Sequence, residues 1–189
     1  GQVPDYFPLE AGNVWIFSNR HTGAQSSREA LILALREPAA WVHLAAHGFA
    51  RPQLLGYAGT WLASPSDPAK SEFLSWLDVA NTALAAPLAV LNACQLAAGP
   101  SATSQSSLSF AVAVSAAGID HVVAAFWPIS DSASALWIPA LYGAMRGKTA
   151  AHSSAALRQA QLALKRSRAY RHPYYWASLA HFQRLRVAP

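Results

Sequence analysis

Short apolar segments that alternate with helix-like segments constrain the fold of this chain more than any other feature. Three such segments are predicted to be buried strands, namely AAWVHLAAH (39–47), PLAVLNAC (87–94) and IDHVVAAFW (119–127). Segments with apolar residues at helical spacing lie around them, at 26–37, 107–118, 130–145 and 151–169. Strands that alternate with helices form parallel sheets whose faces are covered. The sequence therefore predicts an α/β fold.

Weaker signals place further elements between these segments. Residues 13–17 and 59–63 have the pattern of short strands, and residues 75–81 have that of a short helix. In residues 172–185 a new ordered segment begins after Pro173 and is predicted to end in a strand. The helical segment at 26–37 begins with serine, and the segment at 107–118 begins with serine and ends with glycine, as helix caps do.

Composition narrows the class of protein. Hydrophobic residues make up 53% of the chain and charged residues only 12%, which indicates a globular domain whose sparsely charged surface is partly covered by further chain or by a partner. No apolar run reaches the roughly 18 residues of a membrane span. The single cysteine excludes an internal disulfide and a CxxC zinc site and is typical of a reducing compartment. We therefore expect a cytoplasmic protein without a membrane span.

The net charge of +5 is unevenly distributed. No acidic residue follows Asp131, whereas nine Lys and Arg residues lie between Arg146 and Arg186. Such a basic third is typical either of nucleic-acid contact or of a solvated helix face, including one that docks on an acidic neighbouring domain. No recognition motif or array of stacking aromatic residues accompanies the charge, so nucleic acid is not the expected partner.

Two predicted parallel strands end in residues that can perform chemistry. One ends in His47 and Gly48, and the other in Cys94. A nearby imidazole lowers the pKa of a thiol from its usual value of about 8.5, or takes its proton during attack. A lone cysteine at a strand end is also typical of a small core residue, but a histidine at the end of a second strand favours a nucleophile.

Other site motifs are absent or incomplete. His43 and His47 form H-x-x-x-H, but a strand separates them by about 13 Å and no glutamate follows the first histidine. The segment YGAMRGKT (142–149) has tyrosine where a P-loop needs its first glycine. The sequence predicts no metal site and no cofactor.

Several segments carry a resemblance to a known family. Asn92, Ala93 and Cys94 partly match the caspase signature Q-A-C, and His47 stands 94 − 47 = 47 residues upstream. The chain resembles the CHAT domains, which are caspase-like domains often attached to tetratricopeptide repeats. The resemblance covers about residues 26–183 and rests on the ordered segments VHLAAHG, GTWLA, FLSWLDVANTALAAPLAVLNACQLAAG, SFAVAVSAAGIDHVVAAFWPISD, ALRQAQLAL and HPYYWASLAHF.

This resemblance implies a caspase-like three-layer α/β/α sandwich with a mostly parallel central sheet, related also to separases, and cysteine-dependent cleavage of peptide bonds in a protein substrate. It assigns His47 as the general base and Cys94 as the nucleophile. The N–H groups of Gly48 and Cys94 would stabilise the oxyanion. It also implies a tetratricopeptide-repeat or other regulatory domain as a partner. The alternative is a catalytically silent module of the same fold that acts in docking or assembly.

Asp131 in FWPISD is the candidate for substrate specificity. In separase-like relatives, an aspartate in the matching W-x-x-x-D stretch pairs with a basic residue before the cleaved bond, so the resemblance implies a preference for Arg or Lys at that position. The other interpretation is that Asp131 caps the helix that begins near Ser132. The two roles are compatible.

The same resemblance divides the chain in two. We expect residues 1–25 to be an N-terminal stub or severed linker and residues 26–189 to be the caspase-like domain. CHAT domains carry additional sheet structure before the helix predicted at 26–37, so we expect this chain to be N-terminally truncated.

Overall fold

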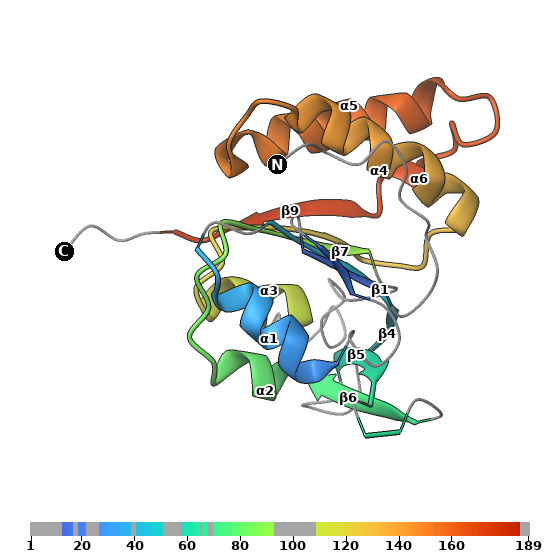
Figure 1. Cartoon of the computed structure of the whole chain (residues 1–189). Coiled ribbons are helices and arrows are strands. Elements are labelled where there is room, and N and C mark those ends of the chain that lie inside the picture. Colours follow the sequence, from blue (N-terminus) through green and yellow to red (C-terminus); the bar gives the residue numbers. More distant parts are fainter. Residues whose placement is uncertain are drawn as a thin grey trace, which may run out of the picture.

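The central element of the fold is a six-stranded sheet with helices on both faces (Figure 1). The computed structural model describes residues 13–16, 19–21, 27–38, 41–50, 58–64, 66–67, 70–92 and 109–185; at 13–16, 19–21 and 47–50 it describes the backbone alone. The strand order is β2-β1-β3-β7-β8-β9. The strands are β1 (Asn13–Ile16), β2 (Asn19–His21), β3 (Trp41–Ala45), β7 (Leu88–Asn92), β8 (His121–Ala125) and β9 (Leu179–Gln183).

The middle of this sheet is parallel, as the sequence predicts. β3 pairs with β7 and β7 with β8 in parallel, whereas β1 and β9 join the two sides of this core antiparallel to it. β2 is antiparallel to β1, so four of the six strands run in one direction. The result is a mixed α/β fold with a mostly parallel central sheet.

The helices form two separate layers. Figure 1 shows one group below the sheet and the other above it. The lower layer contains α1 (Arg28–Arg36), α2 (Trp76–Ala80) and α3 (Phe110–Ala116). The upper layer contains α4 (Asp131–Met145), the short 3-10 helix η2 (Ala150–His152), α5 (Ser153–Arg166) and α6 (Pro173–Trp176). These layers confirm the three-layer sandwich.

Alternate residues of the buried strands serve the two layers. In β7, Ala89 and Leu91 belong to the apolar cluster that faces α1 and α3, whereas Leu88 and Val90 belong to the cluster that faces α4 and α5. Side chains of a strand alternate between its two faces, so a strand covered on both sides has to be apolar throughout. This requirement explains why the three predicted strands are continuous apolar runs.

Serine caps set the helix starts. Ser27, Ser75, Ser109 and Ser130 each accept a hydrogen bond from the backbone N–H three residues on. Such a bond satisfies one of the N–H groups that the first turn of a helix leaves open. The predicted helices at 26–37, 75–81, 107–118, 130–145 and 151–169 are all present, with boundaries that differ by a few residues.

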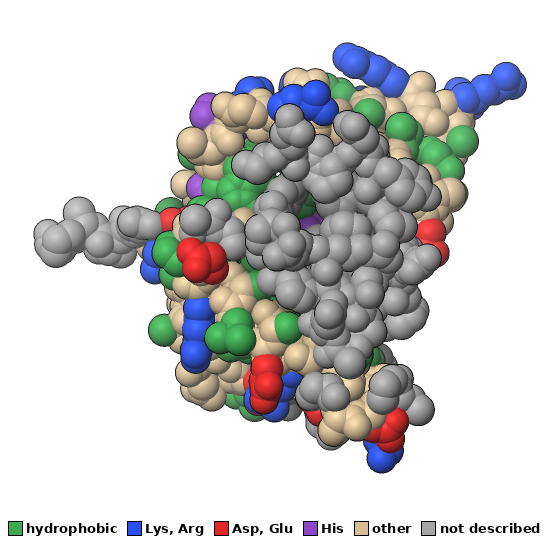
Figure 2. Space-filling model, in the orientation of Figure 1, with side chains coloured by type: hydrophobic (Ala, Val, Ile, Leu, Met, Phe, Trp, Pro, Cys, Tyr) green, Lys and Arg blue, Asp and Glu red, His purple; other side chains and the backbone are tan. Residues whose placement is uncertain are grey.

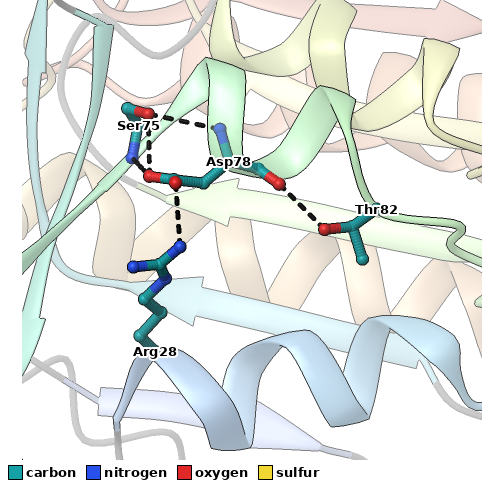
Figure 3. A network of polar contacts seen from close by, with 4 residues as sticks. All are labelled: Arg28, Ser75, Asp78 and Thr82. Carbon is teal, nitrogen blue, oxygen red and sulfur yellow. Dashed lines mark hydrogen bonds and ion pairs between the residues drawn. The ribbon is translucent and has the colours of Figure 1, made fainter.

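One polar network joins the first two helices (Figure 3). Asp78 and Ser75 form a reciprocal capping box at the start of α2, and Arg28 of α1 donates a hydrogen bond of 2.8 Å to Asp78. Burial alone would raise the pKa of Asp78, but the hydrogen bonds from Ser75 and the charge of Arg28 together lower that pKa below its usual value. Thr82 donates to the Asp78 carbonyl oxygen at 2.8 Å and closes the helix.

A buried histidine ties the sheet to α4. The Nδ1 atom of His43 in β3 shares a hydrogen bond of 2.8 Å with the Tyr142 hydroxyl, and burial lowers the pKa of His43 to about 3. His43 is therefore a neutral residue of the core. Because its folded-state pKa lies below the ordinary 6.5, the stability that His43 contributes is lost as the pH falls below 6.5.

The structure differs from the sequence prediction in two places. A second sheet of three antiparallel strands lies beside the lower layer, with β4 (His47–Ala50), β5 (Ala58–Ala63) and β6 (Ser71–Ser75) in that order. The sequence predicted only the middle one as a strand of its own. In addition, β1 and β2 of the central sheet fall within residues 1–25, the segment expected to be a stub or linker.

In the part of the chain that the structure describes, no helix is both long and apolar enough to cross a membrane.

Candidate active site

The three parallel strands end side by side. Ala45 at the end of β3 is paired with Asn92 at the end of β7. Between β7 and β8, the last pair is Leu91 with Ala124, one residue before each strand ends. We call the edge marked by Ala45, Asn92 and Ala125 the carboxyl edge. Neighbouring strands are about 4.8 Å apart, so segments that leave this edge start close together. Ligand sites of open α/β sheets gather beyond such an edge.

His47 and Gly48 follow the end of β3. The sequence placed His47 as the last residue of a strand at 39–47, but β3 ends at Ala45 and a bend at Ala46 precedes a new strand. His47 and Gly48 are the first two residues of β4, opposite Trp61 and Thr60 of β5. The bend transfers the chain from the central sheet to the second sheet, and the apolar Ala45 and Ala46 gave no sequence signal for it.

The structure describes β4 as an edge strand. The order of its sheet is β4-β5-β6, and among the described residues β4 pairs with β5 alone. Alternate N–H groups of an edge strand point away from its only partner and are open to another ligand. β4, which begins with His47 and Gly48, therefore has alternate backbone groups that face away from β5.

Cys94 lies outside the described residues. β7 ends two residues before it, at Asn92. The side-chain oxygen of Asn92 accepts a hydrogen bond of 3.4 Å from the hydroxyl of Ser134, a buried residue of α4. This contact links the end of β7 to the first turn of α4 across 42 residues of sequence, and nothing in the sequence indicated it.

Asp131 is the first helical residue of α4. The cap is Ser130, whose hydroxyl accepts from the Ala133 N–H, so the interpretation that Asp131 caps this helix is wrong. The carboxylate is exposed, and among the described residues it forms no ion pair. Asp131 lies one helical turn before Ser134. Because Ser134 donates a hydrogen bond to Asn92, the start of α4 lies beside the end of β7.

Asp120, the other acidic residue after Cys94, is engaged elsewhere. It precedes β8 at the opposite edge of the sheet, where Arg184 forms an ion pair of 3.0 Å with it. Asp120 is therefore remote from the carboxyl edge.

A reciprocal pair of hydrogen bonds holds the segment that leads to Asp131. The indole N–H of Trp127 donates to the Tyr174 carbonyl oxygen at 2.8 Å, and the Tyr174 hydroxyl donates to the Pro128 carbonyl oxygen at 2.9 Å. The N–H of Phe126 also donates to the Ser178 carbonyl oxygen at 3.0 Å. α6 and the residues that follow it therefore hold the chain between β8 and α4.

Comparison with protein families decides the relationship of this chain. The family model of the CHAT domain matches residues 9–184. The chain belongs to the CHAT domain family. The match begins before β1, so the family pattern includes part of the segment expected to be a stub. A search of curated proteins finds no match to the chain.

CHAT domains are caspase-like and related to peptidases, and the fold described above agrees with that class. The parallel core of β3, β7 and β8 gives this CHAT domain a carboxyl edge, and β4, which begins with His47, follows one of its strands in the chain. Within the described ranges, no group of three or more His, Cys, Asp or Glu side chains could hold a metal ion.

Proposed function

We propose that this CHAT domain is a cysteine endopeptidase in which His47 activates Cys94. The observation that carries the proposal is the register of β3 and β7, which pairs Ala45 with Asn92. His47 follows Ala45 by two residues, and Cys94 follows Asn92 by two residues. Their separation in the sequence, 94 − 47 = 47, equals that of the paired strand ends, 92 − 45 = 47. His47 and Cys94 therefore each follow, by two residues, the carboxyl end of one of two neighbouring parallel strands.

In the proposed reaction, the Cys94 sulfur attacks the scissile carbonyl carbon while its proton passes to the His47 imidazole. The oxyanion that forms accepts hydrogen bonds from backbone N–H groups, for which Gly48 and Cys94 are the candidates. Collapse breaks the C–N bond, and the protonated His47 gives its proton to the leaving amine. Water then attacks the thioester, which releases the carboxylic acid and regenerates the thiol. The reaction needs no cofactor.

We assign Asp131 to the recognition of Arg or Lys before the cleaved bond. The support is its position, since Asp131 begins α4 one turn before Ser134, which contacts the strand that leads to Cys94. The carboxylate has no ion-pair partner in the described part of the chain, so it is open to a ligand cation. A guanidinium group can bind a carboxylate through two parallel hydrogen bonds.

Thiol reactivity tests the nucleophile directly. Cys94 is the only cysteine, so every alkylation event in this chain reports on it. We expect iodoacetamide to label the native protein with a pH midpoint well below the ordinary thiol value of about 8.5. His47→Ala should move that midpoint back toward 8.5, where the denatured protein serves as the reference. A native thiol that stays inert across neutral pH would instead support the docking module.

Substrate choice tests Asp131. We expect Asp131→Asn, which keeps size and shape, to lower kcat/KM for peptides with Arg before the cleaved bond by about tenfold or more, because an ion pair becomes a weaker neutral contact. Cleavage after a neutral residue should change less than about twofold, and Ser132→Ala is the matched control at the adjacent exposed position. An equal loss for charged and neutral substrates would contradict the assignment.

A further inference from the structure

A cluster of exposed cations lies on α5 and the turn that follows it. Its members are Arg158, Lys165, Arg166, Arg168 and Arg171, and we call this cluster the basic face. The layer formed by α4, η2, α5 and α6 contains a single acidic residue, Asp131, at its start. None of the five cations forms an ion pair with a described residue. Figure 2 shows Lys and Arg side chains along the top of the molecule, above the sheet.

Helical geometry places these charges together. Arg158 and Lys165 are seven residues apart in α5, which is about two turns, so they lie on the same side of the helix. Arg166 ends the helix, and Arg168 and Arg171 lie in the turn between α5 and α6. Five like charges therefore occupy one end and one side of the layer.

The turn that carries Arg168 and Arg171 is held by hydrogen bonds. The Trp176 indole donates to the Arg171 carbonyl oxygen at 3.1 Å, and the Tyr170 N–H donates to the Ser167 carbonyl oxygen at 3.2 Å. The Gln161 amide of α5 donates to the carbonyl oxygens of Trp176 and Leu179, at 3.1 and 2.9 Å. A fixed backbone lowers the entropy lost when the cations bind a partner.

Roles within the fold account for only part of this charge. Lys165 and Arg166 lie in the last turn of α5, where cations stabilise the helix dipole, and Lys165 also stacks 5.5 Å from the Trp176 ring centre. Arg168 and Arg171 lie beyond the helix, and Arg158 lies in its middle. Like charges without carboxylate partners repel one another, so the fold gains nothing from these three that neutral polar side chains would not provide.

The chemistry of the basic face favours a protein partner over nucleic acid. Proteins that bind single strands without sequence preference combine a basic groove with aromatic rings on which successive bases stack. The rings next to the basic face pack against each other, with Tyr170 and Tyr174 both edge-on to Tyr175 at 5.2 and 5.5 Å. Four of the five cations are arginines, whose planar groups match carboxylates with two hydrogen bonds each.

We propose that the basic face is the docking surface for an acidic segment or surface of a protein partner. This interaction is independent of the peptidase reaction. The basic face borders the carboxyl edge, because α6 follows the basic turn and contacts Trp127 and Pro128, which lead to Asp131. An acidic partner bound there therefore lies next to the segment that ends at Asp131.

The test measures binding of a fluorescent glutamate-rich peptide to the full chain by fluorescence anisotropy at about 0.15 M salt. Its comparison probes are the same peptide with glutamine for glutamate and a poly-dT strand of equal length. The charge-reversed variant Arg166→Glu/Arg168→Glu is compared with Arg146→Glu/Lys148→Glu, an equal charge change in exposed residues after α4. Arg166→Gln/Arg168→Gln provides a milder variant, and thermal unfolding checks that every variant is folded.

We expect the acidic peptide to bind and the glutamine peptide not to bind. Reversal of Arg166 and Arg168 should weaken binding by about tenfold or more, whereas reversal of Arg146 and Lys148 should weaken it by less than about twofold. Equal losses in the two variants would mean that net charge alone attracts the peptide and would overturn the proposal. Tighter binding of poly-dT than of the acidic peptide, or no binding of the peptide, would overturn it as well.

Discussion

Cys94→Ala is expected to lower the rate of peptide cleavage by at least about 10³-fold, because the proposed reaction has no covalent route without the sulfur. His47→Ala should have a loss of similar size, since the thiol then lacks both its base and the acid for the leaving amine. Residues that act as one unit give losses that do not add, so the double variant should be no slower than the worse single variant. The measurement is kcat/KM on a peptide with Arg before the cleaved bond, with thermal unfolding to show that each variant is folded.

His152 offers the matched control for the histidine substitution. It is an exposed residue at the end of η2, where its Nδ1 atom shares a hydrogen bond of 3.2 Å with the Thr149 hydroxyl. His152→Ala should change kcat/KM by less than about twofold. Cleavage that survives in Cys94→Ala, or losses that simply add in the double variant, would contradict a common mechanism for His47 and Cys94.

The fold could largely be predicted because its strongest signals are local. The runs at β3, β7 and β8 are apolar at every position since both faces are covered, and serine caps mark the starts of α1, α2, α3 and α4. Strand direction at the edges has no local signal. β9 runs antiparallel to β8. The Gln161 side chain of α5 donates a hydrogen bond to the Leu179 carbonyl oxygen of β9, and these two residues lie 18 positions apart in the sequence. A local pattern does not reveal such a contact.

The sequence predicts which strands the candidate residues follow, because that depends only on their position in the chain. His47 and Cys94 follow two apolar runs, and the register of those runs agrees with their spacing. The supports of the site could not be predicted, because they join residues far apart in the sequence. Ser134 reaches Asn92 across 42 residues, and Tyr174 reaches Pro128 across 46. Serine and tyrosine occur at many positions, so composition and periodicity give no indication of such contacts.

The largest effect on stability is expected at Gly118, just after α3. Its φ of 136° belongs to a region that residues with side chains rarely adopt, and a Cβ there would overlap the carbonyl oxygen of Leu84. Leu84 cannot easily yield, because its N–H donates to the Ala117 carbonyl oxygen at 2.9 Å. Gly118→Ala therefore combines backbone strain of about 1–2 kcal/mol with a clash of about 1–3 kcal/mol, and we expect a loss of about 3 kcal/mol in the free energy of unfolding.

Gly143 in α4 provides the opposite case within the same protein. A Cβ at Gly143 meets no atom within 4 Å, and the residue is exposed and helical. Gly143→Ala should stabilise the protein by about 0.5 kcal/mol, because alanine loses less backbone entropy than glycine when the helix forms. Urea unfolding of both variants measures the two effects against the unsubstituted protein. A loss below about 1 kcal/mol in Gly118→Ala would mean that the segment around Leu84 moves away from α3 to make room for the methyl group. The close contact between Gly118 and the Leu84 carbonyl oxygen would then not be rigid.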